Sequence, residues 1–224
     1  GRISLSGDAK TFWPTSLAIL AWQGSAQQRD AQNRAINFLL DVSGKHWPKK
    51  QDSPAAHDSS IRGWSWTEGT HSWIEPTSLA LIALEVAGQT KHSRFKEGTQ
   101  MIMDRQLPQG GWNYGNTAVY GQTLHPFIDT TGLALNALAG HVARKDVEKS
   151  ILLLQSKISG CRTPLSLGWA LFGLGAWEEF PKEGLMWVDE SLKRQDKYGA
   201  YRTSLLSLLS LAAICQGDFR KCVA

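Results

Sequence analysis

Five short segments of the chain share a pattern that predicts the start of a buried helix. Pro at a first helical position loses no needed hydrogen bond, and the oxygens of Thr and Asp there can cap free N–H groups. The residues that follow are small or aliphatic nearly all the way round, which is typical of helices buried on most faces. The five segments begin in the runs 14–20, 76–81, 129–135, 163–167 and 202–206.

Segments of a second kind lie between these five. They carry an apolar stripe at helical spacing and a charged remainder, which predicts half-exposed helices, and they cover 30–42, 95–106, 146–158 and 183–195. Equivalent positions of the buried type are 62, 54, 34 and 38 residues apart, whereas a tetratricopeptide array expects a fixed period of about 34. We therefore expect one all-α domain over 1–224, a toroid (α/α barrel) of about five helical hairpins.

Composition excludes several classes of protein. No window approaches the ~20 consecutive apolar residues of a transmembrane helix, so we expect no membrane span. The formal charge is +4, but the 24 Lys and Arg are scattered, so we expect no nucleic-acid partner. Cys161, Cys215 and Cys222 are odd in number and widely spaced, so we expect ordinary thiols rather than a disulfide framework or a metal site.

The first residue gives an expectation about location. The chain begins at Gly1 without Met, a basic segment or an apolar segment, so we expect a trimmed product whose targeting signal is not in this sequence. A cytoplasmic location is the expectation for what remains.

One run after a half-exposed helix carries a family resemblance. Its defining positions are Gly98, Met101, Ile102, Gln106, Gly110 and Trp112. This run resembles the QW repeat of squalene and other triterpene cyclases, except that Glu97 stands where a basic residue is usual. Weaker copies run through Gln195, Gly199 and Tyr201 and from Arg34 to Trp47. Physically, Gln106 can satisfy backbone groups at a helix end, Gly110 permits a tight turn, and the Trp112 indole stacks across the junction.

The resemblance extends to the terpenoid-cyclase and prenyltransferase toroids, whose motifs can be compared with the chain. Class II cyclases use the central Asp of an Asp-x-Asp-Asp-Thr run as an acid, and here Ile128 precedes Asp129-Thr130 in that place. The zinc ligands of protein prenyltransferases have no counterpart, so no metal and no cofactor is expected. The pattern predicts nine helices against the twelve of a full ring. We therefore expect an open barrel, a missing segment or a partner chain that completes the ring.

Two long connections, 43–75 and 107–128, predict the functional site. Both lead into buried helices and combine aromatic with ionisable residues, which is typical of a pocket mouth. His57, His71 and His125 lack the spacing of a zinc site. Asp129 and Glu75 are the candidate catalytic residues, with helix capping as the alternative. The candidate ligand-binding residues are Trp64, Trp66, Trp73, His71, Trp112, Tyr114, His125 and Phe127.

Two hypotheses about function follow. The first is an enzyme or binding protein for an isoprenoid or another apolar ligand, because an apolar interior with an aromatic mouth can hold a hydrocarbon and stabilise cations through cation–π contacts. The second is a non-catalytic scaffold that binds a ligand or a protein.

Overall fold

A computed structural model describes residues 1–8, 10–49, 53 and 56–223. The chain forms two compact units. Unit 1 comprises Gly1–Gln106 and Tyr114–Leu124, and unit 2 comprises Leu107–Asn113 and His125–Cys222. Most of the described residues are helical, which confirms the predicted class at that level. The strands of the described residues are β1 (Ala118–Val119) and β2 (Gln122–Thr123), a short antiparallel ribbon with Ala118 opposite Thr123.

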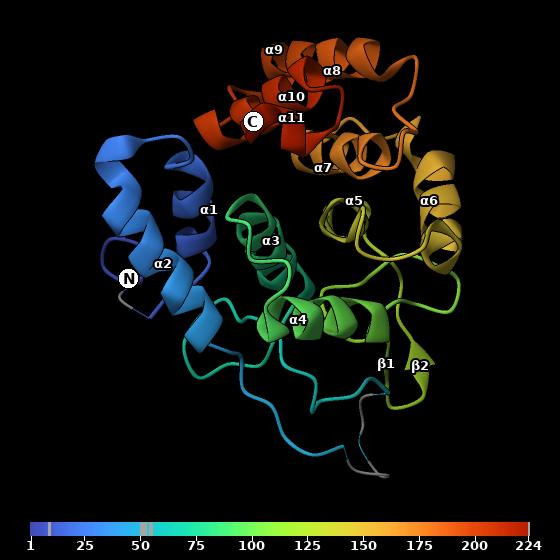
Figure 1. The fold of residues 1–224 in the computed structure, drawn as a ribbon. Helices are drawn as coiled ribbons and strands as arrows, with labels where there is room; N and C mark the ends of the chain where they lie inside the picture. Colours follow the sequence, from blue (N-terminus) through green and yellow to red (C-terminus); the bar gives the residue numbers. More distant parts are fainter. Residues whose placement is uncertain (9, 50–52, 54–55, 224) are drawn as a thin grey trace. The chain divides into compact units, whose positions relative to one another are not determined.

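Unit 1 is built on a helix that is apolar on every face. This helix, α3 (Ile74–Val86), is buried at ten of the eleven positions from Ile74 to Leu84, and the exception is Glu75. Helices α1 (Pro14–Ala21) and α4 (Ser93–Asp104) pack against it, and α2 (Arg29–Asp41) packs against α1 after the short 3-10 turn η1 (Ala26–Gln28) (Figure 1). The more and less buried helices alternate along the chain, as the sequence pattern predicts.

Unit 2 repeats this alternation. Helices α5 (Ile128–Leu138) and α7 (Pro164–Gly175) are largely buried and pack along each other (Figure 1). Helix α6 (Arg144–Ile158) packs against both, and α8 (Gly184–Lys193) packs against α7. The chain continues through α9 (Gln195–Tyr198), α10 (Thr203–Ile214) and α11 (Phe219–Val223), and α10 packs against α7. The short helices η1, α9 and α11 were not predicted.

Glycines allow α5 and α7 to approach closely. A Cβ on Gly132 would overlap the carbonyl of Trp169, and a Cβ on Gly173 would lie 2.6 Å from the Cα of Gly132. The Asn136 amide donates to the Phe172 carbonyl at 3.1 Å, so the one buried polar side chain at this contact has a partner across it. The backbones of two otherwise apolar helices therefore meet with nothing larger than a glycine between them.

The second copy of the resembled repeat shows how its residues act at a helix end. Gln195 accepts a hydrogen bond from the Tyr201 backbone N–H at 2.9 Å and donates to the Leu192 carbonyl at 3.1 Å. Gly199 makes the turn with φ of +89°. The Tyr201 hydroxyl then donates to the Ser191 carbonyl at 2.9 Å. Glutamine, glycine and aromatic ring here fasten the end of one helix to the segment that follows it.

The predicted caps are wrong in detail. The N-cap of α5 is Phe127, so Asp129 is the second residue inside the helix rather than its cap. Thr163 does occupy the N-cap of α7, but its side chain makes no cap hydrogen bond. Both Asp129 and Glu75 still lie in the first turn of a helix, where a carboxylate favours the positive end of the dipole.

The expectation that all five apolar helices are buried on most faces is wrong for two of them. In α1 only Thr15, Ser16 and Ile19 are buried. The second exception is α10. Only Leu209 and Ala212 of this helix are buried, while Leu211 is 38% and Ile214 79% exposed. The sequence of α10 is as apolar as that of α7, so periodicity alone could not separate them. Burial depends on which elements pack against a helix, and α10 has neighbours on part of its surface.

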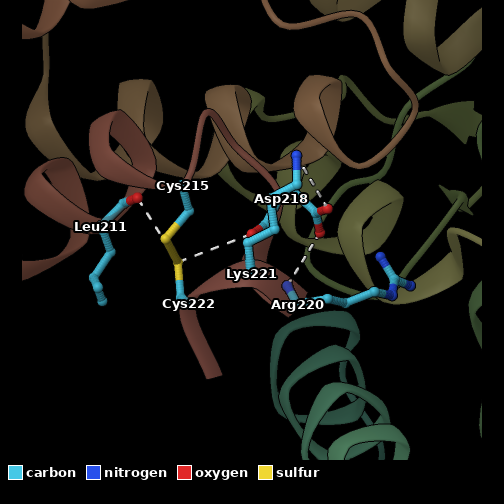
Figure 2. Close-up of a disulfide and its surroundings, with 6 residues drawn as sticks. All are labelled: Leu211, Cys215, Asp218, Arg220, Lys221 and Cys222. Carbon is cyan, nitrogen blue, oxygen red and sulfur yellow. Dashed lines mark hydrogen bonds and ion pairs between the residues drawn. A yellow bond between two sulfur atoms is a disulfide. The ribbon is translucent and has the colours of Figure 1, made fainter. Parts of the chain in front are cut away.

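The expectation of three ordinary thiols is wrong for two of them. Cys215 and Cys222 form a disulfide, and the buried Cys161 is free (Figure 2). Cys215 ends α10 and Cys222 lies in α11, and the turn between them, with positive φ at Gln216 and Gly217, brings their Cα atoms within 5.8 Å. Two of the three cysteines, seven residues apart in the sequence, therefore form a local disulfide that the odd number and the spacing of the cysteines did not indicate.

Candidate functional site

An open cleft in unit 1 has a volume of about 690 Å³. Small-molecule sites usually occupy about 300–1,000 Å³, so the cleft has the size of such a site. Its walls come from the first long connection, from the start of α3 and from Tyr114. The lining residues are Lys45, Trp47, Trp66, Thr67, Gly69, Thr70, His71, Trp73, Glu75 and Tyr114.

Four aromatic side chains, Trp47, Trp66, Trp73 and Tyr114, line the cleft. Trp47 and Tyr114 are each 47% exposed, which is unusual for rings of this size. Trp66 packs edge-on against Trp13 with ring centroids 5.9 Å apart, and Trp73 packs against the His71 ring at 4.2 Å. Trp66 and Trp73 are therefore packed against neighbouring rings, and Trp47 and Tyr114 are about half exposed.

Backbone hydrogen bonds hold the cleft segments together. The Trp73 N–H donates to the Trp64 carbonyl at 3.0 Å, and the Ile74 N–H donates to the Tyr114 carbonyl at 2.8 Å. On the opposite wall the Lys45 N–H donates to the Thr70 carbonyl at 2.8 Å. The long connection is thus fastened at several points, so the aromatic rings are positioned before any ligand arrives.

Trp64 supports the cleft from the core of unit 1. Its side chain is 1% exposed, its indole N–H donates to the Leu39 carbonyl at 2.9 Å, and the Arg94 guanidinium lies 4.3 Å over its ring. A Cβ on Gly98 would lie 2.6 Å from this indole, so glycine is required where the repeat has a small residue. Trp64 therefore fills the space between the long connection and α4 and does not line the cleft.

Glu97, the departure from the resembled repeat, has a partner in the structure. It accepts from Arg62 at 2.7 Å and from the buried Arg94 at 2.8 Å. Burial by itself would raise the pKa of Glu97, but the hydrogen bonds from Arg62 and Arg94 outweigh burial and lower the pKa. The acidic residue at this position thus compensates an arginine that is only 5% exposed beneath Trp64.

A smaller cavity of about 210 Å³ adjoins the cleft and shares Lys45, Trp47 and His71 with it. Most of its lining residues carry polar side chains, and none of those that the structure describes is a carboxylate. Burial, with Arg105 and His71 nearby, lowers the pKa of His57 to about 4, and burial lowers the pKa of Arg105 to about 10. At neutral pH His57 is therefore uncharged and Arg105 is a cation. The other lining residues are Ser53, Ser59 and Asn116.

The structure brings half of the predicted site residues together. Five of them line the cleft: Trp66, His71, Trp73, Glu75 and Tyr114. The others, apart from Trp64, belong to unit 2 and are not in the cleft lining.

The unit 2 residues have varied surroundings. Trp112 is fully buried, and its N–H donates to the Thr131 hydroxyl at 3.1 Å. His125 is exposed, and its carbonyl accepts from the Asn113 amide at 2.6 Å. Phe127 lines a small cavity of about 180 Å³ with α6 residues. These positions favour a structural role for Trp112.

Sequence reasoning missed three residues of the site. From its sequence context Trp47 belongs only to a shortened copy of the repeat, and Lys45 and Arg105 are two of the 24 scattered basic residues. Arg105 is the C-cap of α4 and is 3% exposed. Its position directly before Gln106 of the repeat was the available signal, because a charged residue next to a structural motif at a helix end is often buried with it.

Metal and membrane sites were also sought in the part of the chain that the structure describes. No group of three or more His, Cys, Asp or Glu side chains is placed to hold a metal ion. No described helix has the length and apolar character needed to cross a membrane.

Comparison with known proteins assigns no family to the chain. No protein-family model matches it, and no curated protein matches its sequence significantly.

Proposed function

We propose that the aromatic cleft of unit 1 binds an isoprenoid or another apolar small molecule. The supporting observation is the set of four aromatic rings around about 690 Å³, with Trp47 and Tyr114 half exposed in the absence of a ligand. Covering an aromatic ring with an apolar ligand gains about 1.5–3 kcal/mol, so two such rings supply about 3–6 kcal/mol of the roughly 8 kcal/mol that micromolar binding requires, and burial of the ligand's own apolar surface adds to this. The sequence resemblance to squalene cyclases points to the same ligand class.

Conversion of the ligand would use the same cleft. Aromatic faces stabilise carbocations, and Glu75 is the carboxyl group of the lining. A non-catalytic binding module would hold the ligand unchanged. Mass spectrometry of squalene and polyprenols after incubation with the protein separates the two, since a new product identifies an enzyme and recovery of unchanged bound ligand identifies a binding module.

The binding proposal is tested with one variant and a matched control. Tyr114→Ala removes a ring from the cleft, whereas Tyr120→Ala removes an 84% exposed ring outside its lining. In a thermal-shift titration with squalene and polyprenols, we expect the parent and Tyr120→Ala to be stabilised alike and Tyr114→Ala to bind about tenfold more weakly. No stabilisation of the parent by any member of the panel would refute the proposal.

We further propose that the two units together form the α/α toroid expected from sequence. Support comes from the alternation of more and less buried helices, which holds in both units except at α10. Spin-label distances among α1, α3, α5, α7 and α10 test this arrangement. A ring requires neighbouring pairs to be closest in chain order, and any other order of distances contradicts it.

A further inference from the structure

A disulfide fastens the short helix α11 to the end of α10. Cys215 is the C-cap of α10 and is 7% exposed, while its partner Cys222 lies in α11 and is less buried (Figure 2). Helix α11 has five residues, and isolated helices shorter than about 12–15 residues are marginal in water. Its helical form therefore depends on its attachments to the elements around it.

The Cys215 end of the disulfide is fixed by contacts other than the sulfur–sulfur bond. The Cys215 N–H donates to the Leu211 carbonyl at 2.9 Å, and the Gly217 N–H donates to the Ala212 carbonyl at 2.9 Å. A Cβ on Gly217, where φ is +73°, would overlap the Leu171 carbonyl, so this turn lies directly on the backbone of α7. The end of α10 therefore keeps its contacts when the disulfide opens.

The other end of the disulfide depends more on the bond itself. Phe219 packs edge-on against the buried Phe172 of α7 with ring centroids 5.3 Å apart, and the Arg220 side chain donates to the Ala139 carbonyl. The Asp218 carboxylate accepts from the Arg220 N–H at 3.1 Å at the start of the helix. These contacts involve the first two residues of α11, whereas the disulfide holds its fourth residue.

We propose that this disulfide is a redox switch, which holds α11 on α7 when oxidised and releases it when reduced. A thiolate of a dithiol reductant attacks Sγ of Cys222, and Cys215 leaves as a thiolate and takes up a proton. The second thiol of the reductant then displaces Cys222, so the reductant becomes a disulfide and the protein gains two thiols. Without the covalent tie, α11 is too short to remain helical, and Phe219 no longer covers Phe172.

The switch goes beyond the proposed function, because both cysteines belong to unit 2 and neither lines the cleft. Hydrogen exchange of the full chain, followed by mass spectrometry with and without dithiothreitol, tests it. We expect the amides of residues 219–222 to exchange at least tenfold faster after reduction, because a cross-link between residues seven apart restricts the unfolded segment. Peptides from α6 should be unchanged. Equal exchange of residues 219–222 in the two states would overturn the proposal, and this comparison needs no variant.

Two cysteine variants separate this disulfide from a general effect of the reductant. Cys222→Ser is expected to exchange rapidly at residues 219–222 without dithiothreitol and to be insensitive to it. Cys161→Ser removes the free thiol of unit 2 and is expected to respond as the parent does. A response of Cys222→Ser equal to that of the parent would contradict the switch. So would three free thiols per denatured, unreduced chain, since the disulfide leaves one of the three cysteines free.

Discussion

At the scale of single residues, the surroundings of each tryptophan decide whether its side chain supports the core or lines the cleft. Trp64, Trp73 and Trp112 all follow glycine-rich or turn-rich stretches, yet Trp64 and Trp112 are buried while Trp73 lines the cleft. The difference depends on contacts with distant segments, such as Arg94 over Trp64 and Thr131 beside Trp112. These contacts involve residues far away in the sequence, so the sequence around each tryptophan does not predict whether its indole is buried or exposed.

The first prediction concerns Trp112. Because its side chain is fully buried, Trp112→Ala is expected to lower the free energy of unfolding by about 3–5 kcal/mol. Chemical denaturation measures the change. Tyr198→Ala is the control in unit 2, since this ring is 67% exposed and its loss should cost less than about 1 kcal/mol. Equal stability of the two variants would show that Trp112 does not support the fold.

The second prediction concerns His57, whose pKa is lowered to about 4 by burial and by the nearby charges of Arg105 and His71, with Asp58 opposing them and Lys49 adding slightly. The unfolded chain takes up a proton near pH 6.5, before the folded chain does. Stability is therefore present above that pH and is lost as pH falls from about 6.5 to about 4, with a slope of up to about 1.4 kcal/mol per pH unit.

Denaturation curves measured between pH 4 and pH 8 test this linkage. His57→Gln should remove this part of the pH dependence, while the exposed His92, replaced in the same way, should leave it intact. A parent protein and His57→Gln with identical pH profiles would mean that His57 titrates normally.

At the scale of elements, the helix bodies were predictable and their ends were not. Residues that are apolar on all faces predicted the positions of α3, α5 and α7. An apolar stripe on an otherwise charged segment predicted α2, α4, α6 and α8. The caps of α5 and α7 and the exposure of α10 depend instead on where neighbouring segments pass. The Cys215–Cys222 disulfide was missed for a related reason, because it is created by an unpredicted turn and the short helix α11.

The third prediction concerns the contact between α5 and α7. Gly132→Ala places a methyl group where the Trp169 carbonyl lies, so the helices must separate, and we expect a loss of about 1–3 kcal/mol in the free energy of unfolding. Gly160→Ala is the matched control, since the nearest atom to its added Cβ is 3.9 Å away. A Gly132→Ala variant as stable as Gly160→Ala would contradict this close packing.

At the scale of the whole molecule, the sequence predicted a largely helical chain without a membrane-spanning helix, and both are found in the described residues. The site was predicted as one mouth formed by two long connections. The structure builds its cleft in unit 1, from the first connection and Tyr114 of the second. Lys45 and Trp47 line that cleft because of how the first connection folds, and the sequence of this connection has no helical or strand periodicity from which its path could be predicted. Arg105 lines the adjoining side cavity from the end of α4.

The most direct test of the proposed function is photo-crosslinking with a benzophenone-bearing polyprenol, mapped by peptide mass spectrometry. The cleft lining predicts crosslinks within residues 45–47, 66–75 and at Tyr114, all removed by competition with unlabelled polyprenol. Crosslinks confined to residues 126–128 and 153–157, which line the small cavity of unit 2, would place the ligand elsewhere and contradict the account. Labelling that unlabelled polyprenol does not reduce would also contradict it.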